Sequence, residues 1–203
     1  MDIFVTDNVS EKFYRAVKDA HDTFPDYIQK MDTRIILGHT LFDINPSLRH
    51  RKNHYWGDVA MMYRFRTDEI LLGEHARSLT SGKLVKNQTI LGGIAHEIGH
   101  AFDRTIFNDP EEQLCFSNDE EQPFIHAWRH DVKELKHDPD QYKPLGEIFE
   151  RHMVEGGYGA RETFAEIWAN AHGQSGLWDH GIDDIRLFWP ACTAVIEECI
   201  AHL

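Results

Sequence analysis

The sequence predicts an α+β protein, with a small mixed sheet in its N-terminal half and a helical C-terminal half. Short β-like apolar runs occur before about residue 85, and apolar residues recur at helical spacing after it. A group of strands followed by a group of helices is typical of segregated layers rather than of alternating βαβ units. We therefore expect one domain over residues 1–203, with an N-terminal lobe over about 1–105 and a helical C-terminal lobe over about 106–203.

The N-terminal half contains several short candidate elements. Ser10 can act as the N-cap of a helix that continues to His21. The polar segment between the last two strands predicts a hairpin. The expected strands are Ile3–Thr6, Arg34–Leu37, Val59–Phe65 and Glu69–Gly73, with the hairpin turn at Arg66–Asp68.

The C-terminal half is predicted to be helical almost throughout. Pro190 falls inside the last helical stretch, so we expect a kink or a break there. The expected helices cover about 87–105, 122–137, 143–153, 161–172 and 182–202.

Composition limits the classes of partner. The chain has 203 residues with 41% hydrophobic residues, enough apolar material for a sizeable core. It carries a formal net charge of -13, which repels phosphate backbones and anionic lipid headgroups. The charge therefore argues against a nucleic-acid or membrane partner, and it leaves the oligomeric state open.

Targeting and redox signals are few. The segment Met1–Asp7 has no basic region followed by an apolar run, so we expect synthesis in the cytoplasm without a cleavable signal peptide. Cys115, Cys192 and Cys199 are too few and too scattered for a disulfide framework, and none has the Cys-x-x-Cys spacing of a structural zinc site. We interpret them as thiols in a reducing compartment.

The segment His96–His100 has the sequence His-Glu-Ile-Gly-His, whose side chains can bind a metal and transfer a proton. On an α-helix, residues four apart lie on one face, so both imidazoles can bind one tetrahedral Zn²⁺. Glu97 is rotated by about 100° around the axis, which places its carboxylate as a base for an attacking water rather than as a ligand. His96 and His100 are the predicted zinc ligands and Glu97 the predicted catalytic base.

The surrounding helix favours this interpretation. From Thr89 to Phe102 the one charged residue is Glu97, while Leu91, Ile94, Ile98 and Phe102 recur at helical spacing. Gly92, Gly93 and Gly99 each weaken a helix by about 1 kcal/mol relative to Ala, which is easier to explain if another part of the chain approaches closely. The alternative is a buried helix that carries two core histidines with satisfied hydrogen bonds.

Glu162 is the best candidate for a third zinc ligand. It shares one helical face with Glu166, and two carboxylates at this spacing repel each other unless something compensates. A metal bound by Glu162, with Glu166 accepting a proton from a ligand imidazole, would relieve the repulsion. Asp103 lies on the stripe of the histidines and is expected to support the site from outside it. The alternative for the two glutamates is a solvated acidic face.

Three segments together resemble the catalytic domain of anthrax lethal factor and related bacterial gluzincin peptidases, which include the Pro-Pro endopeptidases. The resemblance covers roughly residues 85–172. It is carried by His96–Asp103, by Tyr158-Gly159 and by Glu162–Glu166.

The resemblance implies a zincin-like fold and a zinc-dependent endopeptidase. It makes Glu162 the third ligand and Tyr158 the donor of a hydrogen bond to the developing oxyanion, although Tyr158 precedes Glu162 by a shorter interval than in the family. His152 is the other candidate donor. The resemblance also implies an edge strand that holds an extended peptide substrate, which we place at Glu69–Gly73.

Two cellular roles and two other site types remain open. A toxin or effector that is secreted or injected into a target cell fits the resemblance, and a housekeeping peptidase fits the same residues. A di-iron helical protein would use the pairs Glu97/His100 and Glu134/His137 with Glu162. A non-catalytic domain would use zinc only for stability, with His126 and His130 as two further histidines four residues apart in a predicted helix.

Overall fold

The computed structural model describes residues 1–50, 59–78, 81–87, 90–107, 115–138, 140, 151–156, 158–173 and 185–202. The chain divides into two compact units, Met1–Glu97 and Ile98–Leu203. The first contains a small mixed sheet and the second is helical in its described part. The predicted α+β class is confirmed. The division falls within a helix rather than near residue 105, where the sequence placed the lobe boundary.

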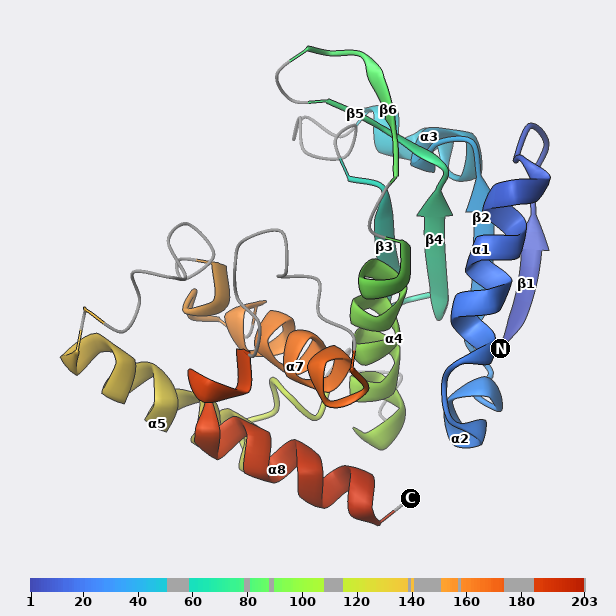
Figure 1. The fold of residues 1–203 in the computed structure, drawn as a ribbon. Helices are drawn as coiled ribbons and strands as arrows, with labels where there is room; N and C mark the ends of the chain where they lie inside the picture. Colours follow the sequence, from blue (N-terminus) through green and yellow to red (C-terminus); the bar gives the residue numbers. More distant parts are fainter. Residues whose placement is uncertain are drawn as a thin grey trace. The chain divides into compact units, whose positions relative to one another are not determined.

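The sheet of the first unit has four strands in the order β1-β2-β4-β3 (Figure 1). β1, β2 and β4 run parallel to one another, and β3 is antiparallel to β4. The bounds are Asp2–Val5 for β1, Arg34–Gly38 for β2, Met61–Arg64 for β3 and Glu69–Gly73 for β4. All four predicted strands are present, and the β3–β4 hairpin is confirmed.

The edge position assigned to Glu69–Gly73 is wrong. β4 lies between β2 and β3, and all five of its residues are buried. Its backbone N–H and C=O groups are occupied on both sides by the ladders with its neighbours. No edge is left on β4 to which an extended peptide could add, so this strand cannot hold a substrate by strand addition.

Short elements connect the strands of the first unit. The helix α1, Glu11–Asp22, begins after Ser10, whose hydroxyl accepts a hydrogen bond from the Phe13 N–H, so the predicted N-cap is confirmed. The short helix α3 packs against β2 and β4. The sequence did not predict α2 (Asp26–Gln29), α3 (Leu41–Ile44), the 3₁₀ turn Pro46–His50, or the antiparallel pair β5 (His75–Arg77) and β6 (Leu84–Lys86).

Four longer helices follow in the described part of the chain. They are α4 (Ile90–Phe107), which crosses the boundary between the units, α5 (Pro123–His137), α7 (Tyr158–Ala171) and α8 (Pro190–Ala201). A 3₁₀ turn at Ile185–Leu187 precedes α8. The helix expected at 143–153 falls mostly outside the described residues.

Pro190 is the first residue of the last helix, so the break predicted at this position is confirmed. The missing N–H of a proline costs nothing at the first position of a helix, and its fixed φ suits that position. The buried carboxylate of Asp131 on α5 accepts hydrogen bonds from the N–H groups of Ala191 (3.2 Å) and Cys192 (2.9 Å). Pro190 and Asp131 together fix where α8 begins.

The core of the second unit surrounds α7. From Glu162 to Ala169 every residue of this helix is buried. Phe164 stacks on Phe102 of α4 with ring centroids 6.4 Å apart, and it meets Phe124 of α5 edge-on at 5.1 Å. A helix that is buried all round is a fixed platform for the polar side chains it carries.

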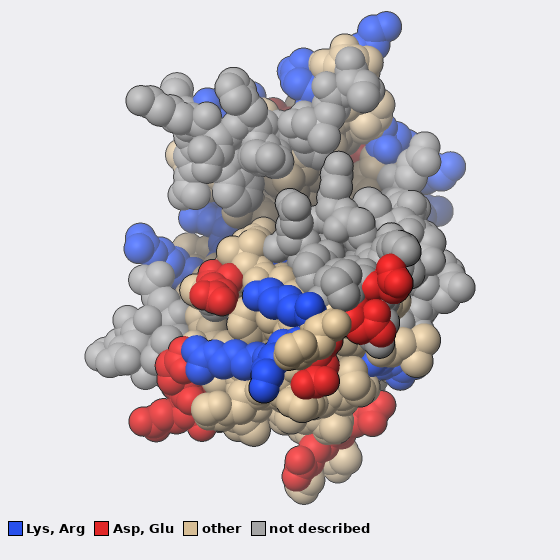
Figure 2. All heavy atoms as spheres, turned by 90° about the vertical axis from the view of Figure 1, so that its left-hand side faces the viewer, with Lys and Arg blue, Asp and Glu red and all other residues tan. Residues whose placement is uncertain are grey.

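The described surface mixes both signs of charge. Figure 2 shows basic and acidic side chains next to one another on the face that it displays. Arg129, for example, pairs with Glu120 at 2.5 Å.

The three cysteines are free thiols, as predicted. None of the described helices has the length and apolar character needed to cross a bilayer.

Candidate metal centre

The predicted motif lies in the middle of α4. Ile94, Ile98 and Phe102 are buried as the spacing predicted, whereas Leu91 is exposed near the start of the helix. This buried stripe fixes the rotation of α4 about its axis. His96 is half-buried and His100 is 9% exposed, one helical turn apart. His96 and Glu97 are the last residues of the first unit, and the same unbroken helix continues to His100.

The third predicted ligand lies beside the second. Glu162 Oε1 is 3.6 Å from His100 Nε2. One nitrogen or oxygen from each of His96, His100 and Glu162 lies within 4.8 Å of the other two. Ligand atoms of tetrahedral zinc are about 3.3 Å apart when each bond is about 2.0–2.1 Å long. Small side-chain rotations would therefore let the three residues hold one zinc ion.

Burial excludes the solvated alternative for the two glutamates. Glu162 is 6% exposed and Glu166 is 2% exposed. A buried carboxylate is costly unless it is paired, hydrogen-bonded or bound to a metal. Burial of Glu162 therefore requires compensation, which Arg151 provides on one carboxylate oxygen and a metal could provide on the other.

Gly99 allows the two helices to approach. A Cβ built on Gly99 would lie 2.8 Å from the Cα of Ala165 and 2.7 Å from its carbonyl oxygen. Real Cβ atoms do not come this close to backbone, so only glycine fits at position 99. The predicted close approach to this helix is confirmed, and the approaching segment is the turn of α7 that follows Glu162.

Arg151 is a site residue that the sequence analysis missed. It pairs with Glu162 Oε2, while Oε1 faces His100. Arg151 also forms a side-chain hydrogen bond with Tyr158. A charged partner on one carboxylate oxygen holds the group in orientation and leaves the other oxygen for a metal. The sequence offered no signal, because eleven residues separate Arg151 from Glu162.

Tyr158 and Glu162 belong to the same helix. Tyr158 is the first residue of α7, one turn before Glu162, and its side chain is 51% exposed. Its ring therefore extends from a helix into solvent. His152, the other candidate donor, is 2% exposed, and its Nδ1 lies 3.2 Å from Thr163 Oγ1. Its ring is enclosed in the core, which removes it from consideration as a donor to substrate.

Asp103 connects α4 to the turn at residues 115–118. Its carboxylate accepts hydrogen bonds from the Ser117 N–H (2.8 Å) and the Ser117 hydroxyl (2.5 Å). Complete burial raises the pKa of Asp103 to about 7, against the opposing effects of the Ser117 hydrogen bonds and of the Arg161 charge. Asp103 thus fixes the helix that carries the histidines, while its predicted support of the ligands themselves stays a prediction.

The residues needed by the rival site types lie elsewhere. Glu134 and His137 are exposed on α5 and belong to neither of the two potential metal-binding groups found among the described residues. His126 and His130 are also exposed on α5. The di-iron arrangement therefore lacks one of its two Glu-x-x-His pairs at the site.

A second group was not predicted from the sequence. His39, Glu74 and His75 of the first unit each offer a ligand atom within 4.8 Å of the others. The only sequence signal is positional, because His39 follows one predicted strand by two residues and Glu74 follows another directly.

No protein-family model matches the chain. No curated protein matches it either. The resemblance to gluzincin peptidases therefore rests on the sequence segments quoted for it.

Proposed function

We propose that this protein is a zinc-dependent endopeptidase with a zincin-like catalytic centre, in which His96, His100 and Glu162 hold the metal. One observation carries the proposal: the predicted third ligand, 62 residues beyond His100, lies 3.6 Å from it. Random placement of a buried glutamate would rarely bring it to a His-Glu-x-x-His helix. Two imidazoles and one carboxylate are also a donor set that catalytic zinc uses.

The chain's own residues then have separate tasks. Zinc bound there would polarise the scissile carbonyl and acidify the attacking water. Glu97 takes the proton from that water and delivers it to the leaving amine. Tyr158, exposed one turn before Glu162, donates a hydrogen bond to the oxygen on which negative charge develops. Arg151 holds Glu162 in orientation, and Glu166 supports a ligand imidazole.

The substrate is a protein or peptide bound in an extended form. β4 cannot bind it, since both of its edges are occupied. Secretion or injection as a toxin or effector stays part of this proposal, with housekeeping proteolysis as the other role.

Replacing Glu97 by Gln tests the proposal. The change keeps the shape of the side chain and both histidines but removes the base, so we expect hydrolysis to fall by at least about 10²–10⁴-fold. Zinc content measured by mass spectrometry should be unchanged. Activity is measured as new peptide N-termini in a proteome-derived peptide mixture.

Glu134→Gln is the matched control. Glu134 is an exposed glutamate on α5, and the di-iron arrangement needs it whereas the peptidase does not. Full activity in Glu134→Gln with loss in Glu97→Gln supports the peptidase. A fully active Glu97→Gln protein overturns it, and bound zinc without hydrolysis of any peptide would favour a non-catalytic zinc domain.

A further inference from the structure

The carboxyl ends of two neighbouring parallel strands bring three potential ligands together in the first unit. β2 and β4 are paired in register, with Gly38 opposite Gly73. His39 directly follows Gly38, and Glu74 and His75 directly follow Gly73. Carboxyl ends of parallel strands are a common place for binding sites in sheets, because the strands end together there.

Backbone hydrogen bonds continue past the strand ends and fix these residues. The Glu74 N–H donates to the Gly38 carbonyl at 2.8 Å, and the His75 N–H donates to the His39 carbonyl at 2.9 Å. The backbone is closely packed at Gly73, since a Cβ there would lie 3.1 Å from the His75 carbonyl oxygen and 3.2 Å from the Leu41 backbone nitrogen. The ligand positions are therefore held by rigid backbone, which a metal site requires.

The three side chains form a donor set for a transition metal. The rings of His39 and His75 lie with centroids 4.5 Å apart and tilted by 43°. One ligand atom of each of His39, Glu74 and His75 lies within 4.8 Å of the others. Imidazole nitrogens together with a carboxylate suit Zn²⁺, Cu²⁺ or Ni²⁺ rather than Mg²⁺ or Ca²⁺.

One polar atom of the group is unsatisfied. His75 Nδ1 is buried and has no hydrogen-bond partner among the described residues. A buried polar atom without a partner costs about 1–3 kcal/mol. A metal ion, or a ring turned to bind one, would remove this cost.

Glu74 can serve as a ligand and keep its present contacts. Its carboxylate accepts hydrogen bonds from the Ser10 hydroxyl (2.7 Å) and the Ser10 N–H (2.9 Å), and Lys86 lies 3.7 Å away. An ionised carboxylate has about four acceptor positions, so these contacts leave room for a metal. They also hold Glu74 in place beside the start of α1.

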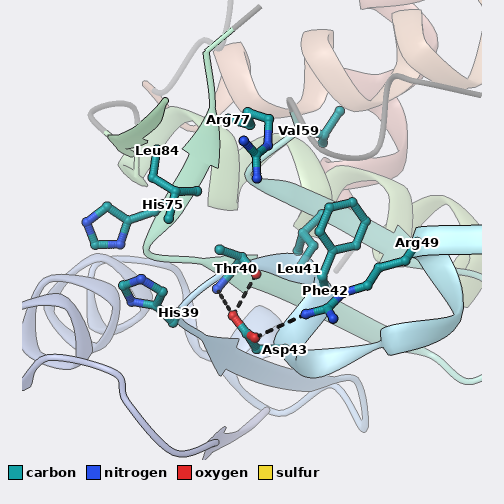
Figure 3. Close-up of a pocket in the computed structure, with 10 residues that line it drawn as sticks. All are labelled: His39, Thr40, Leu41, Phe42, Asp43, Arg49, Val59, His75, Arg77 and Leu84. Carbon is teal, nitrogen blue, oxygen red and sulfur yellow. Dashed lines mark hydrogen bonds and ion pairs between the residues drawn. The ribbon is translucent and has the colours of Figure 1, made fainter. Parts of the chain in front are cut away.

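A cavity adjoins the group. His39 and His75 line one part of a cavity of about 430 Å³, together with Thr40, Arg77 and other residues of the first unit. Figure 3 shows the two imidazole rings next to each other at one side of this cavity. A metal held by three protein ligands, two of them at the wall of this cavity, would keep a coordination position for water or a small ligand.

We infer that His39, Glu74 and His75 form a second transition-metal site, separate from the His96, His100 and Glu162 group and open to this cavity. The inference stands independently of the proposed peptidase activity, because it shares no residue with that group.

Metal counting in variants tests the inference. In untagged His96→Ala/His100→Ala protein, equilibrium dialysis against Zn²⁺ followed by elemental analysis should find one zinc per chain. Adding His39→Ala should reduce this to none. Adding His126→Ala instead, which removes an exposed histidine of α5, should leave one. Circular dichroism establishes that each variant is folded.

A second measurement does not depend on the His39 variant. In the same His96→Ala/His100→Ala protein, Zn²⁺ should protect His39 and His75 from modification by diethylpyrocarbonate, while His126 stays reactive. Mass spectrometry of the digested protein reads each site. Absence of zinc from the double variant, or equal modification of His39 with and without Zn²⁺, overturns the inference and leaves the proposed peptidase untouched. If the double variant binds zinc but the unmutated protein hydrolyses no peptide, the proposed peptidase is rejected and the second metal site stands.

Discussion

Gly99 shows how one missing methyl group controls the candidate centre. The backbone of Ala165 occupies the space that a Cβ at position 99 would need. Glu162 lies three residues before Ala165, so the same close approach brings its carboxylate to His100. The conformational cost of a glycine within a helix, about 1 kcal/mol relative to Ala, is therefore offset by a contact that only glycine permits.

Gly99→Ala should destabilise the protein by about 1–3 kcal/mol, the cost of forcing extra volume into a packed interior. It should also weaken zinc binding, because α7 must move away from α4. Urea unfolding of the metal-free protein gives the first quantity, and competition with a zinc indicator gives the second.

Gly93→Ala is the matched control on the same helix. A Cβ there would meet the Met61 thioether, 2.3 Å from Sδ, and this is the far end of a flexible side chain that can turn away. The gain in helix propensity should make Gly93→Ala neutral or slightly stabilising. If both variants lose the same stability, the explanation from the Ala165 backbone is wrong.

At the scale of elements, Asp103 attaches α4 to the 115–118 turn through a buried carboxyl. Its pKa is about 7 in the folded protein because burial disfavours its charge, and a carboxyl in an unfolded chain has a pKa of about 3.9. The folded state therefore binds more protons than the unfolded state between these values. The contribution of Asp103 to stability is greatest below about pH 4, falls as the pH rises toward 7, and is constant above that.

Asp103→Asn removes this titration and keeps an oxygen that can accept from the Ser117 N–H. The free energy of unfolding of metal-free Asp103→Asn should fall less between pH 4 and 7 than that of the unmutated protein, with a difference on the order of a few kcal/mol. Urea unfolding at several pH values measures it. Other carboxyls titrate in both proteins and cancel in the difference, so parallel pH profiles would contradict the assignment.

Two other elements illustrate what neighbours add to local sequence. The stretch around Pro190 reads as helix on both sides, but Asp131 from α5 caps the chain at Ala191 and Cys192 and makes Pro190 the first residue of α8. Glu69–Gly73 reads as a strand, and whether it is an edge or an interior strand depends on β2 and β3.

At the scale of the whole molecule, zinc binding should couple to stability. His100 and Glu162 belong to different helices, and an unfolded chain does not hold them together. His39→Ala protein keeps only the His96, His100 and Glu162 group. In this protein, Zn²⁺ at 100 times its dissociation constant should raise the free energy of unfolding by about 2.7 kcal/mol. For a chain of this size the melting temperature should rise by about 5–10 °C over its value in chelator.

Two comparisons check that this gain comes from the proposed ligands. In His39→Ala/Glu162→Gln protein, Zn²⁺ should raise the melting temperature much less, since the glutamine amide is a poor replacement for a carboxylate ligand. Mg²⁺, which prefers all-oxygen sites, should not reproduce the effect in His39→Ala protein. If Zn²⁺ does not change the melting temperature of His39→Ala protein, the proposed metal centre is wrong.

The sequence alone determined the features that depend on neighbours within a few residues. These are the α+β class, the four strands, the Ser10 cap and the i, i+4 placement of His96 and His100, all of which follow from local periodicity and hydrogen bonding. Glu162 was predicted as well, because two glutamates on one helical face require compensation.

Only the tertiary structure decided which distant residues meet. The pairing of Arg151 with Glu162, the interior position of β4 and the grouping of His39 with Glu74 and His75 were all missed. Each depends on strand register or helix packing between segments that no local pattern connects. Side-chain spacing along one element is set by its own geometry, whereas contacts between elements are set by how their buried faces fit.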